Sequence, residues 1–110
     1  MPYVEGFQRA RVLTVMKHFG LNNQEDDRER TNAIVRDERV LWEAYHAPYA
    51  AAVGAGVAAA MCSYNLVNGT HACSNSQLLA SDLKVRAVLF FFRTPVPRVG
   101  GPTVTTGRLM

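Results

Sequence analysis

The residues of this chain that could do chemistry begin at the end of an apolar stretch near its start. Lys17 and His18 close the run at residues 11–19, and a segment rich in amide and carboxylate groups, Asn22 to Glu25, follows almost at once. An ammonium group beside an imidazole donates well to hydroxyl oxygens. On spacing alone, however, the commoner meaning of such a pair is an exposed lysine beside a satisfied core histidine.

A second polar segment follows a second apolar run. Residues 57–61 are small and apolar and end at Met61, and residues 62–76 then carry hydroxyl and amide groups, Tyr64 among them. An isolated Ser-Tyr-Asn most simply places a tyrosine over a core. Asn68-Gly69-Thr70 in the same segment has the form of a glycosylation sequon. It reads first as a tight turn, which Asn-Gly favours.

The chain has two cysteines, Cys62 and Cys73, at the start and near the end of that second polar segment. No His or Cys pair has zinc-site spacing, so a metal site is not expected, and no cofactor motif is present. Two interpretations stay open from the residues alone. The cysteines are two buried thiols, or they form a disulfide that closes the polar loop in an oxidising compartment.

The elements that must position these residues can be read from periodicity and breakers. Asp37 is a candidate helix N-cap, and Glu38 suits the first turn. Pro48 should kink or reset that helix, and Gly54 and Gly56 should end it. The expected elements, in order, are a strand at 11–19, a loop at 20–36, a helix from 38 to 53, a strand at 57–61, a loop at 62–76, a helix at 76–84 and a strand at 85–92.

This order of strands and helices predicts an α/β fold with parallel strands and right-handed crossovers. Each of the first two strands runs at its carboxyl end into a polar loop. Active sites of α/β barrels and doubly wound sheets lie at those ends. Lys17 and His18 would therefore point toward a site.

Composition narrows the function classes. The chain has 110 residues, enough for one domain or less, and 48% of them are apolar and 19% charged, which is typical of a globular protein. Twelve basic residues are scattered among nine acidic ones, which argues against nucleic-acid binding. No apolar run approaches the ~20 residues of a membrane-spanning helix. The first residues lack the order of a secretion signal, and the localisation stays unknown.

At this point the motifs resemble a known family. The stretches KHFGLNNQE, MCSYN and NGTHACSN, in this order and spacing, are similar to the N-terminal barrel domain of glycoside hydrolase family 3, which contains β-glucosidases and β-xylosidases. The likeness extends from about Tyr3 to about Lys84. It implies a partial (β/α)8 barrel of two to three βα units. It also implies retaining hydrolysis of β-linked sugars, with an Asp nucleophile and a Glu acid/base.

The resemblance also assigns roles to individual residues. Lys17 and His18 match a Lys-His pair that hydrogen-bonds sugar hydroxyls, and Met61 and Tyr64 match residues near the same sugar. Cys62 and Cys73 match a pair that can form a disulfide in relatives. The implied partner is a carbohydrate, a β-glucoside or β-xyloside.

The likeness stops within the chain. Residues 1–84 are assigned to the barrel fragment, and residues 85–110 to a divergent tail that is frameshifted in appearance or disordered after about residue 93. Relatives place their nucleophile where this chain has no acidic residue, since Asp82 is its last one and lies too early, in a helix. We therefore expect the chain alone to be inactive.

Two further expectations follow. Three strands of an eight-stranded barrel leave open sheet edges, so the isolated chain should be marginally stable and prone to self-association. The alternative function is a non-catalytic carbohydrate-binding or scaffolding protein that keeps half a sugar site. Millimolar or tighter sugar binding that is lost in a Lys17→Ala, His18→Ala variant would favour that alternative.

Overall fold

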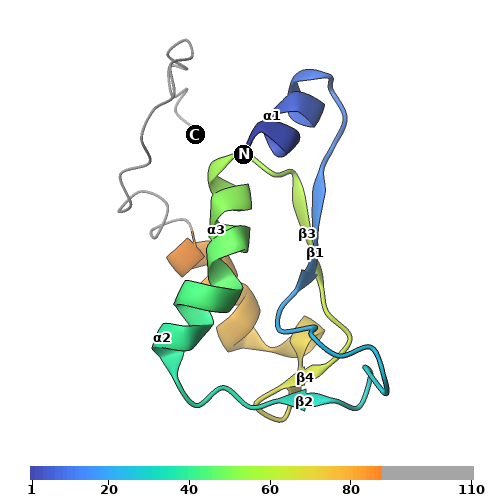
Figure 1. The fold of residues 1–110 in the computed structure, drawn as a ribbon, viewed down its shortest axis with the longest axis vertical. Coiled ribbons are helices and arrows are strands. Elements are labelled where there is room, and N and C mark those ends of the chain that lie inside the picture. The colour runs from blue at the N-terminus through green and yellow to red at the C-terminus, as the bar shows by residue number, and fades with distance from the viewer. Residues whose placement is uncertain (88–110) are drawn as a thin grey trace.

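The computed structural model describes residues 1–87 and shows helices packed beside a pair of parallel strands (Figure 1). Strand β1 (Val15–Phe19) lies next to β3 (Ala59–Cys62), and α3 (Ala47–Gly54) runs alongside them. A small second sheet of β2 (Asn32–Ala33), β4 (Leu66–Val67) and β5 (Thr70–His71) lies at the end opposite α1 (Pro2–Arg9).

The parallel pairing of the two main strands confirms the α/β prediction. Val15 pairs with Ala59, and Met16 pairs with Ala60. The first strand is shorter than expected, because residues 11–14 were predicted to belong to it. Arg11 has a φ of 60°, in the left-handed region, which ends α1 and delays the strand to Val15.

Helix α1 was not predicted, although it has local signals. Pro2 lies in its first turn, Glu5 is acidic near the start and Arg9 is basic near the end. In its last turn, the Gln8 side chain accepts from the Thr14 amide at 3.1 Å and donates to the Gly56 carbonyl at 2.8 Å. Those two bonds tie α1 to the start of the strand pair.

The predicted helix after Asp37 is present, and its cap is confirmed. The Asp37 carboxylate accepts from the Arg39 amide at 2.8 Å. The helix runs from α2 (Glu38–Val40) through the π-helical segment η1 (Leu41–His46) into α3. Pro48 lies in the first turn of α3, where the π-helical segment gives way, and α3 ends at Gly54 as expected.

The loop at 62–76 contains more structure than expected. A short hairpin of β4 and β5 is followed by a 3-10 turn, η2 (Ala72–Ser74). β2 pairs in parallel with β4, so the long loop after β1 is fastened to this hairpin. The turn reading of Asn68-Gly69 is confirmed, since both residues have positive φ, 49° and 83°.

The last described helix is π-helical, η3 (Gln77–Arg86), and it corrects one prediction. Val85 and Arg86 were expected to open a third strand, but they continue this helix. The rest of that strand, and the tail after it, lie outside the described residues. Leu78 of η3 packs with Phe19, Val67 and Ala72 in the hydrophobic core.

Cys62 and Cys73 form a disulfide in the structure, with their Cα atoms 5.2 Å apart. It joins the end of β3 to η2 and closes the loop that carries the β4–β5 hairpin. Within residues 1–87, no helix is both long enough and apolar enough to span a bilayer.

Candidate functional site: the carboxyl end of the strand pair

Lys17 and His18 lie at an irregularity in the main strand pair. Met16 pairs with Ala60 and Phe19 pairs with Cys62, so two residues of β1 stand opposite Met61 alone. An extra residue of this kind bends a strand and re-aims its side chains, and such bulges are common next to active sites. The peptide bonds Lys17–His18 and Phe19–Gly20 are both cis. The register thus brings Lys17, His18 and Met61 to one place along the pair.

Ser63 fixes the end of β1 against the end of β3. Its amide donates to the Phe19 carbonyl at 2.6 Å, and its hydroxyl donates to the Gly20 carbonyl at 2.7 Å. The Gly20 amide donates back to the Ser63 hydroxyl at 3.0 Å. Ser63 is buried, so these bonds are shielded from water. No signal in the sequence singles out this serine, because its partner Gly20 lies 43 residues away.

His18 and Tyr64 are brought together by this arrangement. Their ring centroids are 5.2 Å apart at 54°, a tilted contact. On the backbone side, the Tyr49 hydroxyl donates to the His18 carbonyl at 2.8 Å. Burial raises the pKa of Tyr49, so its hydroxyl stays protonated and keeps donating. This bond gives Tyr49 a role in positioning His18.

Arg28 is a neighbour of Tyr64 that the sequence reading missed. Its guanidinium carbon lies 4.0 Å from the centre of the Tyr64 ring, a cation–π distance. Glu25 accepts from Arg28 at 2.9 Å and so holds the guanidinium in place. The pairing of β2 with β4 holds the loop between these segments in place.

A cavity of about 620 Å³ borders part of the candidate site. Lys17 and His18 are among its lining residues, with Asn22, Tyr45 and Tyr49. Met61 and Tyr64 do not line it. Both are partly exposed, at 47% and 39% of their surface. The structure therefore groups the four candidates by strand register and by the His18–Tyr64 contact, and not around one cavity of the described residues.

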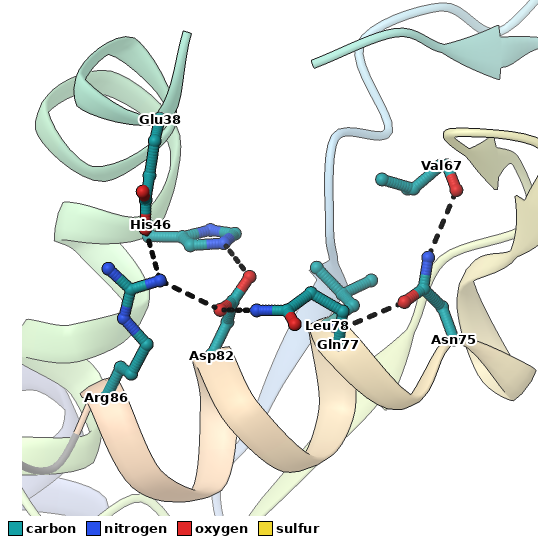
Figure 2. A network of polar contacts seen from close by, with 8 residues as sticks. All are labelled: Glu38, His46, Val67, Asn75, Gln77, Leu78, Asp82 and Arg86. Atoms are coloured by element: carbon teal, nitrogen blue, oxygen red, sulfur yellow. Dashed lines mark hydrogen bonds and ion pairs between the residues drawn. The ribbon is translucent and has the colours of Figure 1, made fainter. Parts of the chain in front are cut away.

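A buried polar network lies beside the end of β1 (Figure 2). The His46 ring contacts Phe19, with centroids 5.1 Å apart, and its Nε2 is 3.5 Å from the Asp82 carboxylate. The other Asp82 oxygen accepts from Gln77 at 3.0 Å and lies 3.6 Å from Arg86, which also pairs with Glu38. Asp82 is 3% exposed, and these contacts occupy its carboxylate.

Because of His46, this network should make the free energy of unfolding decrease as the pH falls. Burial lowers the pKa of His46 below its ordinary 6.5, against the opposing attraction of Asp82. As the pH falls, His46 therefore takes up a proton at a higher pH in the unfolded chain than in the folded chain. Stability should be full above pH 6.5 and fall below it, by at most about 1.4 kcal/mol per pH unit for this group.

Urea unfolding between pH 7.5 and 5.5 would measure that dependence. Replacing His46 with leucine should flatten the slope over this range. The matched control is His71→Leu, at an exposed histidine, which should keep it. Equal slopes in the wild type and the His46 variant would contradict the assignment.

The candidate side chains around the strand ends are an ammonium, an imidazole, a phenol and a thioether, from Lys17, His18, Tyr64 and Met61. This set suits hydroxyl-rich ligands better than metals. Among residues 1–87, no cluster of three or more His, Cys, Asp or Glu side chains could hold a metal ion. A family model, described as the glycosyl hydrolase family 3 N terminal domain, matches residues 1–91. The chain belongs to glycosyl hydrolase family 3.

Relatives within family 3 agree with this assignment. A probable β-glucosidase L of Aspergillus terreus is 44% identical over 81 residues, which are 74% of this chain and 11% of that protein. β-Glucosidase cel3A of Pyricularia oryzae is also 44% identical over 81 residues. This family 3 chain therefore spans about a tenth of the length of the curated relatives that it matches.

Solved family 3 structures match the fold as well. DesR, a β-glucosidase from Streptomyces venezuelae solved in complex with D-glucose, is 40% identical, with a TM-score of 0.73 over 76% of this chain and 11% of that one. The β-D-glucoside glucohydrolase of Trichoderma reesei is 44% identical, with a TM-score of 0.71 over 74% of this chain and 11% of its own. The α/β fold with parallel strands is thus shared with β-glucosidases.

Proposed function

We propose that this chain is a segment of a retaining β-glucosidase-like barrel and supplies part of its sugar subsite. In that role Lys17 and His18 donate to the hydroxyls of the sugar, and Met61 and Tyr64 lie against it. The observation that carries the proposal is the His18–Tyr64 contact at the carboxyl ends of paired parallel strands. The glucose complex of the Streptomyces venezuelae relative supports a carbohydrate as the ligand.

The proposal includes a division of labour between this chain and the rest of such an enzyme. Retaining hydrolysis needs two carboxylates that flank the scissile bond. The four candidate residues carry none, and the two acidic residues that are joined to the site through Arg28 and His46 are engaged elsewhere. Glu25 binds Arg28, and Asp82 is buried with His46. We propose that residues 1–84 act as part of a partial barrel, that residues 85–110 add no catalytic group, and that the isolated chain does not hydrolyse glycosides.

A chimera tests the subsite role directly. Residues 1–84 replace the matching segment of the Aspergillus terreus relative, and hydrolysis of a chromogenic β-glucoside is measured. Lys17→Ala and His18→Ala should each lower kcat/KM about 10²- to 10³-fold, because a donor to a developing charge or a sugar hydroxyl is removed. The matched controls are Lys84→Ala and His71→Ala, at the exposed second lysine and an exposed histidine.

The outcomes separate the parts of the proposal. Site variants that are as active as the two controls would remove Lys17 and His18 from the subsite. Turnover by the isolated 110-residue chain would overturn its inactivity. Calorimetry on the isolated chain gives a further reading. Millimolar glucose binding that is lost in the Lys17→Ala, His18→Ala variant would favour the non-catalytic sugar-binding alternative.

A further inference from the structure

We propose that Asn68 is a site of N-linked glycosylation. Asn68-Gly69-Thr70 is the one Asn-X-Ser/Thr sequence in the 110 residues. The three residues are exposed in the structure. They form the tip of the β4–β5 hairpin, in the small sheet at the end of the molecule opposite α1 (Figure 1). This inference goes beyond the proposed sugar subsite and does not depend on it.

The tight turn by itself accounts for part of this sequence. Asn68 and Gly69 both have positive φ, which the two-residue turn between paired Val67 and Thr70 requires. The turn does not require a hydroxyl at Thr70. Thr70 is exposed, and its hydroxyl has no hydrogen bond to any residue from 1 to 87. The hydroxyl of Thr70, which the sequon requires, is therefore accessible and is not used to hold the turn.

The bonds of Asn68 leave the reacting atom available. Its side-chain Oδ1 accepts from the Val35 amide at 2.9 Å, and its backbone amide donates to the Ala33 carbonyl at 3.0 Å. The Gly69 amide is held in turn by the Asn32 side chain, at 2.9 Å. Within the described part of the chain, no hydrogen bond involves Asn68 Nδ2. The structure thus uses the oxygen of this amide and leaves its nitrogen for modification.

Glycan transfer would preserve the hydrogen bond that the Val35 amide donates to Asn68 Oδ1. The side-chain nitrogen of Asn68 joins the anomeric carbon of an oligosaccharide carried on a polyprenyl diphosphate. The bond from that carbon to the diphosphate oxygen breaks, the diphosphate leaves with the electron pair, and the amide nitrogen loses one proton. The amide carbonyl is unchanged, so Oδ1 can still accept from Val35.

A second observation concerns the compartment. The sequon lies within the loop that the Cys62–Cys73 disulfide closes. Disulfides persist in secreted proteins and in the lumen of the endoplasmic reticulum, and are rare in the cytosol. Glycan transfer to asparagine takes place along the same route, so the two features point to one compartment.

The test is translation of the full 110-residue chain, behind a cleavable secretion signal, in the presence of microsomes. Only molecules whose signal has been cleaved, and which have therefore entered the lumen, are scored. The wild type should gain the mass of one glycan, which an amide-cleaving glycosidase removes. Thr70→Ser should keep the glycan, and Asn68→Gln and Thr70→Ala should lose it.

A matched control shows that the glycosyltransferase of the microsomes can modify this chain. Glu29→Asn, made together with Asn68→Gln, moves the sequon to residues 29–31 in the loop after β1, where residues 29 and 30 are exposed and Thr31 is half-buried. An unmodified wild type beside a modified control would overturn the proposal. So would a glycan that survives Asn68→Gln. The glycosylated wild type should also unfold at the same urea concentration as Thr70→Ala, and a clear fall would mean that the hairpin does not accommodate the glycan.

Discussion

Replacing Phe19 with alanine should destabilise the folded chain by about 3–5 kcal/mol, the loss typical of a fully buried phenylalanine. Phe19 is 1% exposed and packs with Val67 and Leu78 in the core. Its ring also meets the edge of Tyr49 at 5.0 Å and the ring of His46 at 5.1 Å. Alanine would leave a cavity between β1 and the helices, and urea unfolding at pH 7.5 would report it.

Two controls separate the cavity from the loss of any phenylalanine. Phe19→Leu keeps most of the volume and should lose less than about 1.5 kcal/mol. Phe7→Ala removes a ring that is 39% exposed and makes a tilted contact with Tyr3, so its effect should stay below about 1 kcal/mol. If Phe19→Ala unfolds at the urea concentration of Phe7→Ala, the assignment of Phe19 to the core is wrong.

The second large effect is expected at Asp82, where alanine should lower the free energy of unfolding by about 2–4 kcal/mol. The change would leave the Gln77 amide without its acceptor and would remove the anion that faces His46 and Arg86. The loss should be smaller than for a fully buried ion pair, because Arg86 is 41% exposed and keeps Glu38. Figure 2 shows how these groups converge on the carboxylate.

The matched control for Asp82 is Asp26→Ala, at an exposed aspartate, which should change stability by less than about 0.5 kcal/mol. Asp82→Asn should fall between the two, since it keeps the size of the side chain and one acceptor but loses the charge. Far-UV circular dichroism should show either a lower urea midpoint for Asp82→Ala or no folded baseline at all. A midpoint equal to that of Asp26→Ala would show that the network does not stabilise the fold.

Much of the fold could be predicted where a signal and its effect lie close together in the chain. The Asp37 cap acts on an amide two residues away, and the Asn68-Gly69 turn needs only its own backbone angles. The parallel pairing of β1 with β3 also followed from local elements, because a helix between two strands returns the chain in the same direction.

Other elements were missed because contacts distant in sequence decide them. Arg11 in a left-handed conformation delays β1, and Gln8 bridges to Thr14 and Gly56. Val85 has the β propensity of a strand residue, yet it continues η3. Asp82 lies about one turn earlier in η3. It contacts His46 of η1, and Arg86, which also contacts Asp82, pairs with Glu38 of α2. Propensity yields where tertiary contacts are worth more than the preference of one residue.

For the site, the sequence by itself determined the family and the four candidate residues, because the motifs that carry them are local and stand in a fixed order. Only the tertiary structure decided how they meet. A two-against-one register places Lys17 and His18 opposite Met61, a contact across 46 positions joins His18 to Tyr64, and Arg28 lies over that tyrosine. These contacts link segments far apart in the chain, and the distance between such segments is set by the packing of the whole fold and by no stretch of sequence alone.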